Sequence, residues 1–156
     1  MGFHIAIGNV VRRKNDAYDP INDPDEPEFV IEVDPVNDPR NAPLVYSGTP
    51  GDHSNERSPS HTAWTLFARM TGTFDFFFQG PCFVDGPRGV AEVTQETVSY
   101  FSERVRDFQK KYPHADASKD HKHYTPEDGS LERLLWLEYW SAWALGNCES
   151  PGIVWI

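Results

Sequence analysis

Two segments in the first quarter of the chain alternate apolar and polar residues. Residues 3–8 (FHIAIG) and residues 29–34 (FVIEVD) each place large apolar side chains at every second position. Successive side chains of a β-strand point to opposite faces, so this period of two predicts strands with one buried face. Asp-Pro pairs at residues 19–20 and 23–24 favour turns and extended backbone in the connection between them.

In three later segments apolar residues recur at steps of three and four, which predicts three helices. The first helix takes Ser58 as its N-terminal cap and Pro59 as its first position, and it stops at Gly72. The second spans residues 94–112 and is capped by Thr94. Its predicted core stripe consists of Val98, Phe101, Val105, Phe108 and Tyr112.

The third helical segment is apolar around most of its circumference. Residues 125–128 (TPED) have the form of a capping box with proline at the first helical position. Gly129 weakens that first turn, so a start near Ser130 remains open. Residues 131–145 carry most of the apolar side chains, and such a helix is either central to the fold or half-buried against a partner subunit.

These elements predict an α+β fold, in which a small, mostly antiparallel sheet packs against about three helices. Residues 74–78 (FDFFF) fit a short buried strand or an extended core segment, and residues 153–156 (IVWI) a final strand. The length of 156 residues suits one globular domain over residues 1–156. Within it lie an acidic, proline-rich segment at 15–39 and a polar loop at 37–61.

The formal net charge of −10 argues against nucleic acid as a partner, because phosphate binding needs clustered Lys and Arg. No run of 18 apolar residues exists, and the first residues lack the basic start of a signal peptide, so we expect no membrane partner. Cys82 and Cys148 form no CxxC pair. They fit reduced thiols in the cytoplasm, although their spacing leaves a bridge open.

The negative charge is concentrated. Residues 15–39 contain nine Asp or Glu, five Pro and no Lys or Arg. Such a run is either a solvated surface loop or an electronegative face that docks a protein with a basic surface.

A second segment that could bind a ligand is the polar loop that precedes the first predicted helix. Free N–H groups at a helix N-terminus bind anions, and an arginine can grip a phosphate or carboxylate with two parallel hydrogen bonds. The candidate ligand-binding residues are Asn55, Arg57, Ser58 and Ser60. The alternative is that these residues are only turn formers and a helix cap.

The same loop contains the residue types of a hydrolase, with Asp52, His53 and His61 beside several serines. No GxSxG elbow accompanies them, and a triad is defined by its geometry rather than its composition. This catalytic interpretation is therefore an alternative to binding.

Metal binding has only a weak pattern. His121 and His123 can lie on one side of an extended strand, with Asp116 and Asp120 nearby, but an exposed polar loop has the same composition. Because no zinc CxxC pair, HExxH helix, EF-hand loop or Gly-rich phosphate loop is present, we expect neither a metal nor a cofactor.

Two stretches of the chain are distinctive, residues 55–64 (NERSPSHTAW) and residues 134–149 (LLWLEYWSAWALGNCE). Both resemble segments of small, uncharacterised proteins encoded by tailed bacteriophages. The resemblance implies a phage or prophage origin and action in the cytoplasm of a bacterial host. It implies no activity, substrate or catalytic residues.

These observations favour a non-catalytic binding protein that inhibits a host protein or captures a small anionic molecule. The first alternative is the small hydrolase. The second is a structural or assembly protein that forms a homo-oligomer through the Trp-rich helix, by way of Trp136, Trp140 and Trp143.

Overall fold

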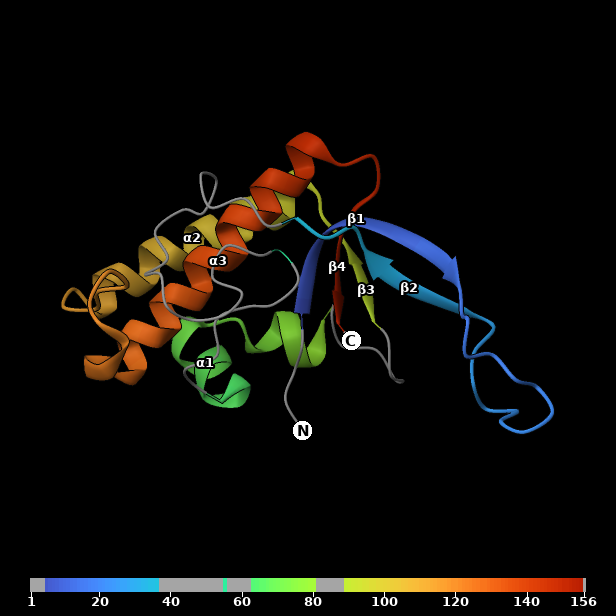
Figure 1. The fold of residues 1–156 in the computed structure, drawn as a ribbon. Helices are drawn as coiled ribbons and strands as arrows, with labels where there is room; N and C mark the ends of the chain where they lie inside the picture. The colour runs from blue at the N-terminus through green and yellow to red at the C-terminus, as the bar shows by residue number, and fades with distance from the viewer. Residues whose placement is uncertain (1–4, 37–54, 56–62, 81–88, 156) are drawn as a thin grey trace.

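The computed structural model describes residues 5–36, 55, 63–80 and 89–155 (Figure 1). Its elements follow in the order β1 (Ile5–Lys14), β2 (Phe29–Val33), α1 (Trp64–Thr71), η2 (Asp75–Gln79), β3 (Val90–Glu92), α2 (Gln95–Lys111), η3 (His121–His123), α3 (Pro126–Asn147) and β4 (Pro151–Trp155). The four strands form one antiparallel sheet in the order β2-β1-β4-β3. This arrangement confirms the predicted α+β fold.

Strand β1 is the longest strand described, and its two halves have different partners. Residues 5–9 pair with β4, whereas residues 10–14 pair with β2 on the other side. The chains pack closely where β1 changes partner, near Gly8 and Gly152. A Cβ atom at Gly8 would lie 2.6 Å from the Nδ2 atom of Asn55, and one at Gly152 would meet the Val10 side chain. Glycine is therefore required at both positions so that the chains can approach.

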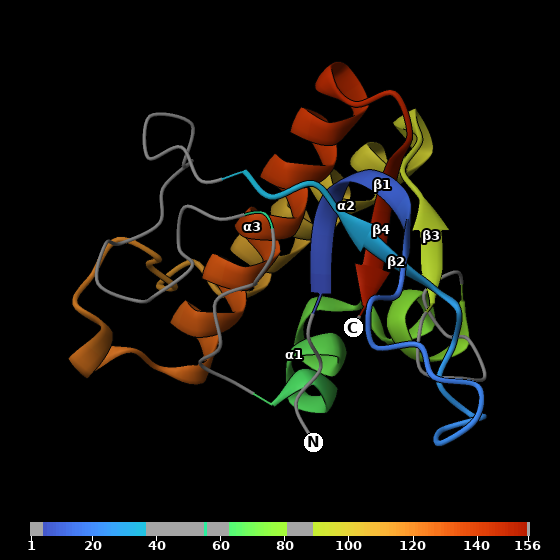
Figure 2. The ribbon, with the colours of Figure 1, turned by 45° about the vertical axis from the view of Figure 1, so that its right-hand side comes forward.

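The core lies between the sheet and the helices. Helix α3 crosses one face of the sheet and packs against β1, β4, α1 and α2, as Figures 1 and 2 show. Ile5, Ile7 and Ile153 meet the fully buried Trp136 and Trp140 in this cluster. A smaller cluster of Ala6, Val33 and Val154 covers the opposite face of the sheet.

Helix α2 confirms the prediction closely. Thr94 accepts a hydrogen bond from the Thr97 N–H, and the Thr97 side chain accepts one in return from the Thr94 N–H. Of the predicted stripe, Phe101, Val105 and Phe108 are buried, and the other two members are half-buried.

Helix α3 begins at Pro126, with a capping box between Thr125 and Asp128. The buried Gly129 lies inside its first turn, so the later start near Ser130 is wrong. The capping bonds hold the turn, which offsets the low helix propensity of glycine.

The aromatic segment after α1 is not a strand. Residues 75–79 form a π-helical turn, in which Phe77 is buried against Trp64 and Phe76 against Phe101. Phe74 stacks on Phe78 with ring centroids 4.9 Å apart. A strand would place consecutive aromatic side chains on opposite faces, whereas the turn brings Phe76 and Phe77 into the same core.

Helix α1 begins later than expected. Its first residue is Trp64, and Ala63 has the extended dihedral angles φ −56° and ψ 138°. Its N-terminal N–H groups therefore belong to residues 64–66, whereas Ser58 and Pro59 fall outside the described residues. At the other end Gly72 adopts φ 69° and stops the helix as predicted.

The predicted C-terminal strand is confirmed by β4, whereas β3 was not expected. Strand β3 has only three residues and too little alternation to be recognised, and it exists because β4 offers it an edge. Within the described residues, no helix is long and apolar enough to cross a membrane.

We expect Phe101→Ala to lower the free energy of unfolding by about 3–5 kcal/mol, because it leaves a cavity where the side chain is fully buried. Urea denaturation followed by circular dichroism measures this loss. The control is Leu66→Ala on the exposed surface of α1, for which we expect a change within about 0.5 kcal/mol. Equal effects of the two substitutions would contradict the assignment of the buried face.

Candidate functional site

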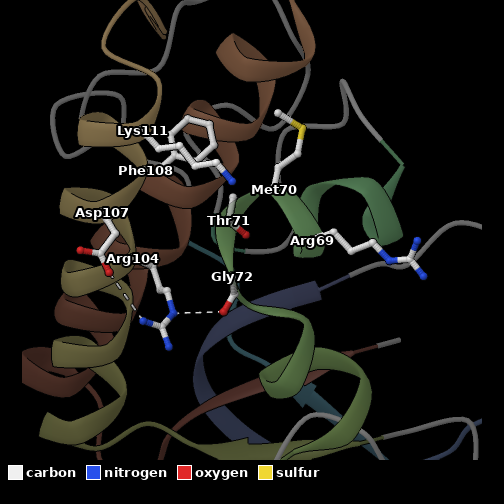
Figure 3. Close-up of a pocket in the computed structure, with 8 residues that line it drawn as sticks. All are labelled: Arg69, Met70, Thr71, Gly72, Arg104, Asp107, Phe108 and Lys111. Atoms are coloured by element: carbon white, nitrogen blue, oxygen red, sulfur yellow. Dashed lines mark hydrogen bonds and ion pairs between the residues drawn. The ribbon is translucent and has the colours of Figure 1, made fainter.

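A cleft of about 340 Å³ opens between the C-terminal ends of α1 and α2 (Figure 3). It is lined by Arg69, Met70, Thr71, Gly72, Arg104, Asp107, Phe108 and Lys111. Three of these side chains are cationic and one is acidic, so the lining carries a formal charge of +2. This local excess of positive charge contrasts with the net charge of −10 on the whole chain.

Arg104 is the most firmly positioned of the three cations. Its Nε atom donates to the Gly72 carbonyl at 3.1 Å, and its guanidinium lies 4.5 Å from the centre of the Tyr100 ring. Its Nη1 atom is 3.9 Å from Oδ2 of Asp107. Figure 3 shows both polar contacts. A guanidinium carries five N–H donors, so Arg104 can bind an anion while it keeps these contacts.

The Tyr100 ring helps to position the Arg104 guanidinium, which lies over it. Burial, together with its hydrogen bond to Asp75, raises the pKa of Tyr100 to about 12. The hydroxyl therefore stays protonated at neutral pH. It donates to Oδ1 of Asp75 at 2.8 Å. The ring is thereby fixed under the Arg104 guanidinium.

The other two cations are exposed and come from the last turns of the helices. Arg69 belongs to α1 and approaches the Phe74 ring at 5.6 Å, and Figure 3 shows it extended away from Arg104. Lys111 is the last residue of α2 and lies 5.3 Å from the Tyr112 ring. The half-buried Met70 adds apolar surface, whereas Phe108 is buried beneath the cleft lining. The cleft can therefore contact an anionic group and an apolar group together.

Helix C-termini carry partial negative charge, and basic side chains there are stabilising without any ligand. That role accounts for the Nε bond of Arg104 to Gly72. It does not account for the grouping of three cations around one hollow, because each helix end needs only its own neighbours. The surplus charge is the feature that suits a bound anion.

The predicted ligand residue Asn55 has a structural role. Its Nδ2 atom donates to the carbonyls of Ile7 and Asp34, both at 2.9 Å, and its Oδ1 atom accepts from the Val36 N–H at 2.6 Å. The residue is completely buried. Because both amide hydrogens are used, Asn55 has no donor left for a ligand.

The remaining residues of that predicted loop lie outside the described residues. They are the ligand-binding candidates Arg57, Ser58 and Ser60 and the catalytic candidates Asp52, His53 and His61.

The histidine pair does not lie on an extended strand. His121 and His123 belong to a 3₁₀ turn, whose backbone is not that of a strand. His123 is exposed. No group of three or more His, Cys, Asp or Glu in the described part of the chain could hold a metal ion.

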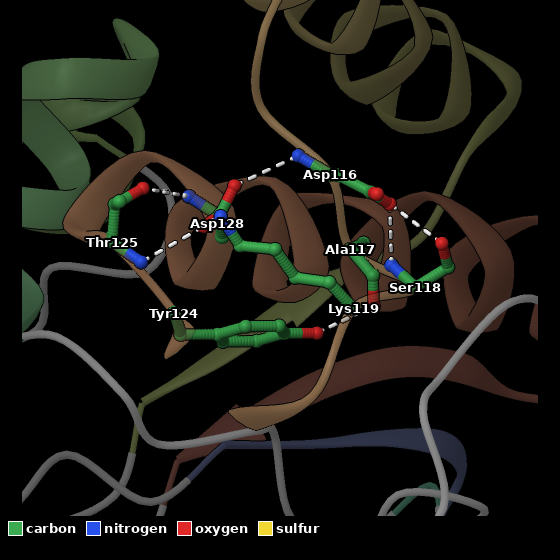
Figure 4. A network of polar contacts seen from close by, with 7 residues as sticks. All are labelled: Asp116, Ala117, Ser118, Lys119, Tyr124, Thr125 and Asp128. Atoms are coloured by element: carbon green, nitrogen blue, oxygen red, sulfur yellow. Dashed lines mark hydrogen bonds and ion pairs between the residues drawn. The ribbon is translucent and has the colours of Figure 1, made fainter. Parts of the chain in front are cut away.

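The connection that carries these histidines is fixed by Asp128 (Figure 4). This buried carboxylate accepts hydrogen bonds from the Asp116 N–H and the Thr125 N–H, each at 2.8 Å, and pairs with the Lys119 ammonium at 2.5 Å. Tyr124 also donates to the Ala117 carbonyl. These contacts anchor the connection to the start of α3.

Burial by itself would raise the pKa of Asp128. The Lys119 ammonium and the backbone N–H groups of Thr125 and Asp116 outweigh this effect and lower the pKa to about 2. The carboxylate is therefore charged at neutral pH, and its charge holds the network together.

Burial also bears on two other predictions, oligomerisation through the Trp-rich helix and the presence of reduced thiols. Trp136 and Trp140 are completely buried within the chain, and Trp143 is half-buried, so the first two offer no surface to a second subunit. Cys148 is a free thiol whose pKa is raised by burial and by nearby Asp34, whereas Cys82 lies outside the described residues.

The sequence contained one signal for the cationic cleft. Arg104 and Lys111 are seven residues apart, which places them two turns apart on one face of α2. Their partner Arg69 comes from another helix, so only the packing of α1 against α2 could bring it near.

No protein family model matches the chain, and no curated protein or solved structure shows significant similarity to it. The resemblance to tailed-phage proteins therefore stays a prediction.

We expect Asp128→Asn to cost about 2 kcal/mol of stability at pH 7, since about 1.4 kcal/mol corresponds to each unit by which the pKa is lowered from 3.8. A lowered pKa stabilises the fold above the unfolded value and loses this contribution as the pH falls. The difference between the wild type and the variant should therefore shrink between about pH 5 and pH 2. Urea unfolding across this range measures it, with the exposed Asp16→Asn as control. A constant difference would contradict an ionic role.

We expect Asn55→Ala to destabilise the protein by about 2–4 kcal/mol, because the Val36 N–H and the carbonyls of Ile7 and Asp34 lose their bonds to this side chain. The matched control is Asn22→Ala, whose side chain makes one exposed bond to Asp19. Chemical denaturation should show little change for this control. Loss of phosphate binding by Asn55→Ala at unchanged stability would instead support Asn55 as a ligand-binding residue.

Proposed function

We propose that this protein is a non-catalytic binding protein that captures a small anionic ligand in the cleft between α1 and α2. The observation that carries the proposal is the grouping of three cationic side chains around one hollow of a strongly acidic chain. Opposite charge and a fixed guanidinium favour a phosphate or carboxylate over a neutral or cationic molecule.

The lining supports binding rather than reaction. Its one hydroxyl, that of Thr71, is buried and bonds to the Phe67 carbonyl and to Thr73. No residue lining the described cleft is a histidine, cysteine or serine. A nucleophile beside a general base, which covalent catalysis requires, is therefore missing from this lining.

The apolar part of the lining narrows the ligand class. The half-buried Met70 lies beside the cations, so a ligand that joins an anionic group to an apolar group can contact both kinds of surface. Asp107 opposes a second negative charge near Arg104, which favours ligands whose anionic group is compact. The resemblance to tailed-phage proteins supports capture in the cytoplasm of a bacterial host.

We expect phenyl phosphate to bind more tightly than inorganic phosphate, because only the former has an apolar group that can cover Met70. Lys111→Gln should weaken phenyl phosphate binding roughly 3- to 10-fold, and Asp107→Asn should strengthen it by removing the opposing charge. Isothermal titration calorimetry and amide NMR shifts measure affinity and location.

The matched control is Lys110→Gln, because this neighbouring lysine is also exposed and carries the same charge but does not line the cleft. It should change the affinity only slightly. Equal losses from the two lysine variants, or NMR shifts confined to residues away from Gly72 and Phe108, would contradict the proposed site.

A further inference from the structure

The β1–β2 ribbon projects from the body of the protein. Strand β1 continues beyond its pairing with β4, and in the described structure residues 10–14 pair only with β2. Figure 1 shows the ribbon and its connecting residues 15–28 extending away from the helices. We call residues 10–33 the arm.

The arm exposes apolar surface. Of the five large hydrophobic residues exposed in the described structure, three belong to it: Tyr18, Ile21 and Phe29. Ile21 is 86% exposed, by far the largest value of the five. Burying such a side chain in a partner would remove a large apolar area from water.

The backbone around Ile21 is held in a defined conformation. The Oδ1 atom of Asp19 accepts hydrogen bonds from the N–H groups of Ile21 at 3.0 Å and Asn22 at 3.1 Å. The Asp23 N–H donates to the Asp19 carbonyl at 2.8 Å. At the base of the loop Asn15 donates to the Glu26 carboxylate at 2.7 Å. The loop therefore presents Ile21 with part of the ordering cost of binding already met.

The charges of the arm are separated along its length. Near its base Arg13 pairs with Glu32 at 3.3 Å and with Asp34 at 2.9 Å. The connection at residues 15–28 contains six Asp or Glu and no Lys or Arg. None of these six forms an ion pair with another described residue. Ile21 is thus an apolar projection surrounded by unneutralised negative charge.

We propose that the arm is a docking surface for a protein with a basic surface, and that Ile21 enters an apolar hollow bordered by lysines and arginines. Charge complementarity selects this occupant, because the acidic loop repels both nucleic acid and anionic membranes. The inference is independent of the anion site, since the arm contributes no residue to the cleft lining.

The test measures the affinity of the full-length protein for two short fluorescent peptides of equal positive charge. One is an amphipathic Lys/Leu peptide and the other is a Lys/Ser peptide that lacks apolar side chains. We expect the Lys/Leu peptide to bind at least about tenfold more tightly, as burial of one large apolar side chain allows. Ile21→Ser should abolish most of this preference, whereas Leu66→Ser, exposed on α1, should leave it intact.

Asp23→Asn and Asp25→Asn together should weaken the binding of both peptides and reduce the dependence of their affinity on salt concentration. Amide NMR shifts should locate the Lys/Leu peptide at residues 19–22. Equal affinity for the two peptides, or an unchanged preference in Ile21→Ser, would overturn the proposal. Concentration-dependent self-association that Ile21→Ser abolishes would overturn it in favour of a second copy of the chain as occupant.

Discussion

Burial of helix α3 is the constraint on which the rest of the structure depends. Its apolar residues surround most of the helix, so it is stable only when it is covered on several sides. The sheet covers one side through β1 and β4, and α1 and α2 cover others. The fully buried Trp136 and Trp140 occupy the centre of this arrangement.

Both candidate binding surfaces follow from that arrangement. Because α1 and α2 pack against the same helix, their C-terminal ends come together and leave the cleft between them. The arm arises for a different reason. Strand β1 is longer than the strand that pairs with its first half, so its second half leaves the body together with β2. The core thus determines where the surfaces lie without taking part in either.

The two surfaces carry opposite charge. The cleft has an excess of two positive charges, whereas the loop of the arm has six carboxylates and no cation. In physiological salt, exposed charges more than about 8–10 Å apart are largely screened from each other. Placing opposite charges on separate surfaces therefore lets each surface keep its own sign. A strongly acidic chain can therefore present a site for an anion while it offers another face to a basic protein.

The local interactions of this protein were determined by its sequence. Thr94 and Thr125 cap their helices, and the stripe at residues 94–112 forms a helix face, because each depends on neighbours within a few positions. Only the tertiary structure decided the rest. Residues 75–79 form a π-helical turn, Asn55 bonds to the Ile7 carbonyl far away in the chain, and Arg69 and Arg104 line one cleft from different helices. These outcomes depend on which surfaces a segment is packed against, and no local pattern of residues records that information.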